Sequence, residues 1–119
     1  MKTFIVTYFS PGTLFSEMNT KEFDCGNLEL LLPIIKSYAE EITQRYGAKP
    51  YGFKIEGLEG TYYIKGTIKT FHQVVQENFG KPDTILIRNM RNNNCTHVIV
   101  GNSPYKFSMP FDPLRDKLI

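Results

Sequence analysis

Apolar side chains recur at spacings of three and four residues in one stretch of the chain, and this is the period of a helix. The stripe comprises Leu31, Ile35, Tyr38, Ile42 and Tyr46. Pro33 is tolerated only in the first turn of a helix, so we expect the helix to begin near Leu30. Gly47 is well placed to end it, with Pro50 just beyond.

Several other segments alternate between apolar and polar residues, which is typical of strands with one buried face. The clearest is a hairpin of residues 51–56 and 62–69 around a turn at residues 58–60. Further strands are predicted at residues 2–9, within 13–23, at 95–100 and at 105–109. The segment after residue 109 contains Pro110 and Pro113, which limit it to a tail or a sheet edge.

Two short helices are predicted between these strands. Thr70 and Gln73 have the spacing of a capping box, and Gly80 and Pro82 can end the helix that follows. Asp83 can cap another helix over residues 84–91.

The order of elements defines the expected fold. Strands joined by short turns must be antiparallel. The chain of 119 residues is therefore predicted to be one α+β ligand-binding domain spanning residues 1–119. It should contain an antiparallel β-sheet, two or three helices packed on one face, and a C-terminal β-hairpin.

Composition excludes some classes of protein. With 13% aromatic residues and a net charge of +2, the chain should fold rather than remain disordered. No apolar run approaches the roughly 20 residues that span a bilayer, so we expect no membrane partner. The first nine residues resemble an export signal. However, Thr7 is polar and Pro11–Gly12 follows without a cleavage pattern, so we interpret them as a strand of an intracellular protein.

The charge is distributed unevenly. Residues 1–60 contain six basic and eight acidic residues, whereas residues 61–119 contain eight basic and four acidic ones. The excess favours an anionic partner for the second half or is simply a solvated face. The basic residues are singly spaced and the isoelectric point is about 8.5, which suits a small anionic ligand better than DNA or RNA.

Signals of catalysis are absent from the sequence. There is no Walker A loop, HExxH or GxSxG motif, and His72 and His97 have no matching metal-ligand partners. We interpret both histidines as structural or surface residues. Cys25 and Cys95 are interpreted as reduced thiols, although a disulfide, a redox role or a Cys25–histidine nucleophile pair stays open. The sequence thus favours a binding protein over an enzyme, with no cofactor and no metal.

One segment does suggest ligand chemistry. Arg88 and Arg91 carry planar guanidinium groups that match phosphate oxygens, and they lie among asparagines that can pair with an adenine edge. A stacking face for a base is offered by Phe79, Tyr105 and Phe107. The alternative is a solvated helix end with the aromatic rings in the core. The charges at residues 112–117 are likewise either a solvated tail or a segment that closes over a ligand or reaches a neighbouring subunit.

Short phrases spread over the chain resemble those of small tailed-phage proteins. They are RYGAKPYGF at residues 45–53, ILIRNMRNN at 85–93, TYFSPG at 7–12 and MPF at 109–111. Within that group the chain is similar to the first described type of phage Thoeris anti-defence proteins. The resemblance implies a non-enzymatic sponge in the host bacterial cytoplasm. Such a sponge holds cyclic ADP-ribose variants from TIR-domain defence enzymes intact between protomers.

The resemblance also implies a set of site residues. Phe79 and Asn89 reproduce the family's spacing of an aromatic platform and an asparagine ten residues later. Lys54 and Lys106 stand where relatives carry arginine, which keeps the charge but loses the bidentate fork. Other candidates for phosphate contacts are Arg88, Arg91 and Arg115. Some relatives form hexamers and bind cyclic oligonucleotides at separate sites, so a homo-oligomer between dimer and hexamer is expected.

Two other functions stay open. One is a phage-encoded inhibitor that acts by direct contact with a host protein. The other is an enzyme that degrades the signal, which the missing acid–base and metal motifs argue against.

Overall fold

The computed structural model describes residues 1–9, 20–77, 79–80, 96–102 and 105–119, with the backbone alone at 102 and 105–107. The elements in chain order are β1 (Lys2–Phe9), β2 (Thr20–Cys25), α1 (Leu28–Tyr46), β3 (Gly52–Gly57), β4 (Gly60–Ile64), β5 (Gly66–Lys69), α2 (Phe71–Glu77), β6 (His97–Asn102), β7 (Tyr105–Pro110) and β8 (Lys117–Leu118). The α+β class and the C-terminal hairpin, β6–β7, are confirmed.

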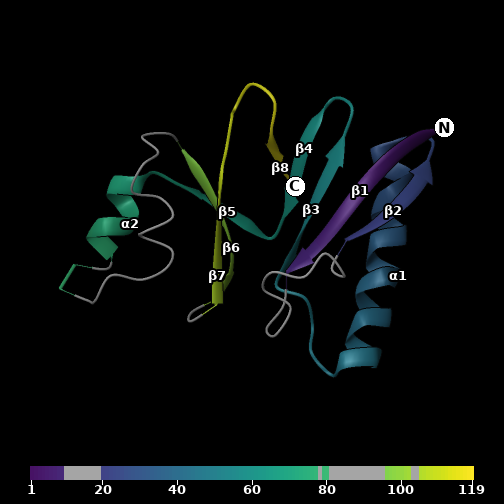
Figure 1. The fold of residues 1–119 in the computed structure, drawn as a ribbon, viewed down its shortest axis with the longest axis horizontal. Coiled ribbons are helices and arrows are strands. Elements are labelled where there is room, and N and C mark those ends of the chain that lie inside the picture. Colours follow the sequence, from purple (N-terminus) through teal and green to yellow (C-terminus); the bar gives the residue numbers. More distant parts are fainter. Residues whose placement is uncertain (10–19, 78, 81–95, 103–104) are drawn as a thin grey trace.

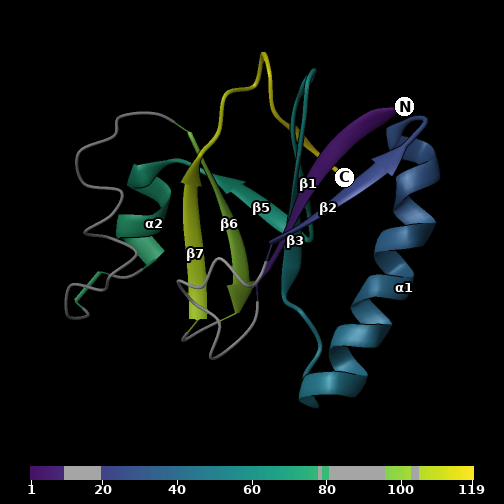
Figure 2. The ribbon, with the colours of Figure 1, turned by 45° about the vertical axis from the view of Figure 1, so that its right-hand side comes forward.

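The strands form two sheets rather than one. A five-stranded sheet has the order β2-β1-β3-β4-β8, and a three-stranded sheet has the order β5-β6-β7. All pairings are antiparallel except that of β4 with β8, which is parallel. Figures 1 and 2 show α1 beside the larger sheet and α2 beside the smaller one. The expectation that the helices share one face of a single sheet is therefore wrong.

Helix α1 begins two residues earlier than the sequence predicts. Asn27 caps it, because its side-chain Oδ1 accepts a hydrogen bond from the backbone N–H of Leu30 at 2.9 Å. Pro33 consequently lies in the second turn, where it cannot donate to the carbonyl of Glu29. The predicted end is confirmed, since Gly47 has φ 73° and its N–H donates to the carbonyl of Thr43 at 2.9 Å.

Three apolar clusters hold these elements together. The largest lies between α1 and the five-stranded sheet, and its buried members include Leu31, Ile35, Val6, Phe53 and Ile55. The second joins the two sheets through Phe9, Tyr63, Val98, Val100 and Phe111. The third places Val74 of α2 against Ile99 of β6. The second cluster is the one that fixes the position of the small sheet on the large one.

The chain changes sheets at Lys65. The alternation over residues 62–69 predicted one strand, but Lys65 has φ 60° and separates β4 from β5. This conformation is uncommon for a residue with a side chain, and it ends the pairing with β3. The single long strand is therefore a wrong prediction, although both halves are extended as expected.

The C-terminal segment is not a solvated tail throughout. β8 pairs with β4, and the N–H of Ile119 donates to the carbonyl of Tyr63 at 2.8 Å. Phe111 and Asp116 are buried, whereas Asp112, Arg115 and other charged side chains of the segment are exposed. Among the helices described, none is both long enough and apolar enough to cross a membrane.

Candidate functional site

Phe79 lies just after α2 and is the most exposed aromatic ring of the described part. Its relative exposure is 88%, and Val75, four residues earlier, is 36% exposed. The backbone N–H of Phe79 donates to the carbonyl of Gln76 at 3.3 Å, and Gly80 then adopts φ 80°. An exposed phenylalanine ring at a fixed helix exit is suited to stacking against a flat ligand.

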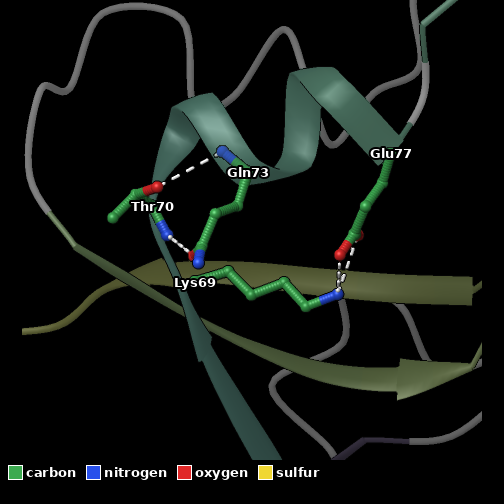
Figure 3. A network of polar contacts seen from close by, with 4 residues as sticks. All are labelled: Lys69, Thr70, Gln73 and Glu77. Carbon is green, nitrogen blue, oxygen red and sulfur yellow. Dashed lines mark hydrogen bonds and ion pairs between the residues drawn. The ribbon is translucent and has the colours of Figure 1, made fainter.

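The position of α2 is fixed by polar contacts at both of its ends (Figure 3). The predicted capping box is confirmed, because Thr70 Oγ1 accepts from the N–H of Gln73 at 3.2 Å. In return, the N–H of Thr70 donates to Gln73 Oε1 at 2.9 Å. At the far end, Lys69 Nζ contacts both carboxylate oxygens of Glu77 at 2.8 and 2.7 Å. The capping box thus fixes the first turn of α2, and the Lys69–Glu77 pair joins its last turn to β5 of the small sheet.

Several predicted site residues lie outside the described residues. They are Arg88, Asn89 and Arg91, together with the predicted helix over residues 84–91 and Cys95. The backbone of β7 includes Tyr105, Lys106 and Phe107. Their predicted roles stay predictions.

Lys54 belongs to the five-stranded sheet. Its Cα pairs with those of Thr7 and Tyr63, and its neighbours Phe53 and Ile55 point to the α1 core, so Lys54 lies on the opposite face. Its ammonium contacts Glu56 Oε1 at 2.8 Å, and its side chain is 27% exposed. Lys54 therefore already has an anionic partner, and it lies on a different sheet from the one that supports α2 and Phe79.

Arg115 lies in the turn between β7 and β8. Its side chain is 69% exposed, with Nε 3.5 Å from Asp116 Oδ1. Asp116 is buried, and its Oδ2 accepts a hydrogen bond from the N–H of Asp112 at 2.9 Å. The Arg115 guanidinium is thus presented to solvent from a turn that the buried carboxylate holds in shape.

The histidines and Cys25 do not come together. His72 is exposed on α2, whereas His97 is buried in β6 with Nδ1 3.3 Å from Ser108 Oγ. Cys25 is a buried free thiol in the cluster beneath α1. This arrangement separates the thiol from both imidazoles, and within the described ranges no group of His, Cys, Asp and Glu is arranged to hold a metal ion.

A cavity of about 260 Å³ at one end of the five-stranded sheet was not predicted from the sequence. It is lined by Lys2, Phe4, Asn27, Leu28, Glu29, Gly57, Leu58, Glu59 and Tyr62. A sequence signal for this cavity was Asn27, a residue type that often caps helices. An Asn27 cap starts α1 at Leu28 rather than near Leu30, and this brings the first turn of the helix to the cavity beside the β3–β4 turn.

No protein-family model, no curated protein and no solved structure matches this chain.

Proposed function

We propose that this protein sequesters a cyclic ADP-ribose-type signalling nucleotide without degrading it, and so blocks bacterial Thoeris immunity from within the host cytoplasm. The observation that carries the proposal is the exposure of Phe79, at 88%. A purine stacked on this ring would remove apolar surface from water. Stacking of a base on an aromatic ring contributes about 1–3 kcal/mol.

The remaining parts of the ligand need polar partners from the second half of the chain. Asn89 follows Phe79 by ten residues and would read the edge of the purine. Arg88 and Arg91 would pair with the pyrophosphate through their guanidinium forks. Nothing in this set abstracts a proton or activates water, so the ligand would be held rather than cleaved.

A second copy of the chain would complete the pocket. Lys54 and Arg115 lie on other elements than the helix preceding Phe79, and we assign them, together with Lys106, to contacts from a neighbouring protomer in a homo-oligomer. Lys54 would exchange Glu56 for a phosphate, and such a partly exposed ion pair is worth only about 0–1 kcal/mol. An enclosing pocket that needs little reordering is compatible with nanomolar affinity, about −12 kcal/mol.

The first experiment is calorimetric titration with a panel of cyclic ADP-ribose isomers, linear ADP-ribose and AMP. The bound ligand is then released by heat and identified by chromatography. We expect tight binding of a cyclic isomer that is recovered intact. Recovery of a cleaved product would instead indicate an enzyme, and capture of one stoichiometric host protein without nucleotide binding would indicate an inhibitor that acts by protein contact.

Variants of Phe79 test whether its exposed ring binds the ligand. Phe79→Ala should weaken binding about 5- to 150-fold, which corresponds to the loss of one stacked base. Phe79→Trp should retain binding, because the flat ring is kept. Tyr46→Ala is the matched control, since Tyr46 is a 61% exposed aromatic residue on α1 and should not alter affinity. Equal affinity of Phe79→Ala and wild type would remove this ring from the pocket.

A further inference from the structure

The cavity at the end of the five-stranded sheet lies apart from the proposed nucleotide site. It is formed where β1 begins, where β3 turns into β4 and where α1 starts. Figures 1 and 2 show these three points at the same end of the large sheet, while α2 lies beside the small sheet. The cavity is close in size to the smallest pockets that hold small organic molecules.

Four of the residues that line the cavity have aromatic or aliphatic side chains. Phe4 is buried and Tyr62 is half-buried, so parts of two aromatic rings line the space. Leu28 of the first turn of α1 and Leu58 of the β3–β4 turn are the two aliphatic lining residues. Leu58 is 93% exposed, which leaves its side chain free to pack on a ligand. These surfaces suit a flat or compact apolar group.

The charged lining residues carry an excess of negative charge. They consist of two carboxylates, Glu29 and Glu59, and one ammonium, Lys2. Lys2 Nζ lies 3.3 Å from Glu59 Oε1, so its charge is already matched. Glu29 makes no ion pair with any described residue.

We propose that this cavity binds a small organic cation, a primary amine attached to an apolar or aromatic body. The ammonium group would lie beside the carboxylates of Glu29 and Glu59, and the apolar body would pack on Phe4 and Tyr62. An anion of the same shape would approach the carboxylate of Glu29, whose charge no described residue matches, and be repelled. Charge complementarity thus selects the amine.

Removal of the Lys2 charge tests whether the ligand is a cation or an anion. Its ammonium competes with an amine ligand for Glu59, so its removal should tighten amine binding. For an anionic ligand Lys2 would be the attractive group, and the same removal should weaken binding. The variant Lys2→Met keeps the aliphatic stem and removes the charge, and it therefore separates the two cases.

The experiment is an NMR titration of the full chain with 2-phenylethylamine, compared with 3-phenylpropionate and 2-phenylethanol. We expect the amine to bind best and to shift the amide signals of Leu28, Leu58 and Tyr62. Glu29→Gln should weaken amine binding by up to about fivefold, because the acceptor loses its charge and an exposed ion pair contributes about 0–1 kcal/mol. Lys2→Met should tighten it. The matched control is Glu40→Gln, an exposed carboxylate about three turns further along α1, which should change nothing.

Three results would overturn the proposal. They are preferential binding of the propionate, weaker amine binding by Lys2→Met, and no binding of any of the three probes. Glu29 is exposed, so its substitution leaves the core intact and the variant can be measured. The Phe79→Ala variant should bind 2-phenylethylamine as the wild type does. This separates failure of the amine site from failure of the nucleotide site.

Discussion

Gly60 lies against the backbone of Arg115, so closely that a Cβ at position 60 would overlap the Arg115 carbonyl oxygen. Gly60 also has φ 149°, a conformation that residues with a side chain rarely adopt. The close contact arises because the C-terminal segment passes the β3–β4 hairpin on its way to pair with β4. The absence of a side chain at Gly60 is therefore a condition for the C-terminal segment to pack here.

Replacement of Gly60 by alanine should destabilise the fold through this contact. We expect Gly60→Ala to lower the free energy of unfolding by more than about 2 kcal/mol, as strain at a backbone contact adds to the unfavourable φ. Gly47→Ala is the matched control, because Gly47 has φ 73° but a Cβ at this position would meet no described atom within 4 Å. It should lose only about 1–2 kcal/mol, the cost of the left-handed conformation alone. Equal losses in urea unfolding would show that the Arg115 contact contributes nothing.

Lys65 is the position where the chain leaves one sheet for the other, and its φ of 60° is unfavourable for lysine. Lys65→Gly should raise the free energy of unfolding by up to about 1 kcal/mol, since the left-handed conformation costs glycine little. Thr67→Gly in the neighbouring strand should lower it by a similar amount, because that position needs extended backbone. A loss of stability in Lys65→Gly, measured by urea unfolding, would contradict this view of the junction.

The junction also shows what the sequence could predict. Local signals succeeded where the structure is local: both ends of β1, the start of β7, the glycine that ends α1, and the Thr70–Gln73 capping box. The division into two sheets was missed because the alternation of residues 62–69 continues through Lys65 and does not report a change of φ. The burial of Asp116 and the pairing of β8 depend on residues about 50 positions away, so no local pattern revealed them.

For the candidate site too, the sequence indicated local features but not those that depend on tertiary packing. The type and spacing of Phe79 and Asn89 could be read from the sequence. Whether a given phenylalanine lies in the core or in solvent depends on tertiary packing, and only the structure separates exposed Phe79 from buried Phe111. The ion pair of Lys54 with Glu56 was not predicted, although the two residues are two positions apart in one strand and therefore lie on the same face of the sheet.

Thr70 should control the stability of α2. Thr70→Ala removes the oxygen that accepts from the N–H of Gln73, and we expect a loss of about 0.5–2 kcal/mol. Thr70→Ser keeps the hydroxyl and should retain most of the stability. The measurement is hydrogen exchange of the α2 amides, which should become faster in Thr70→Ala alone. Unchanged exchange would show that Val74 packing and the Lys69–Glu77 pair hold the helix without the cap.

Tyr63 should make the protein sensitive to alkaline pH. Burial raises the pKa of Tyr63 to about 12, and the negative charges of Asp116 and Glu56 add to this rise. The positive charge of Arg115 lowers the pKa and offsets part of the rise. The ordinary value is about 10, so the folded state holds the phenolic proton more tightly than the unfolded state. This group's contribution to stability is complete below pH 10 and is lost as the pH rises towards 12.

The size of that loss is at most about 2–3 kcal/mol, because each pKa unit corresponds to 1.36 kcal/mol. Tyr63→Phe should flatten the fall in unfolding free energy between pH 10 and 12, whatever its effect at neutral pH. Asp116→Asn should flatten it in part, since one of the carboxylates that raise the Tyr63 pKa is removed. Urea unfolding at several pH values measures the slope, and phenolate absorbance follows the titration itself. A slope equal to that of the wild type in Tyr63→Phe would place the alkaline transition elsewhere in the protein.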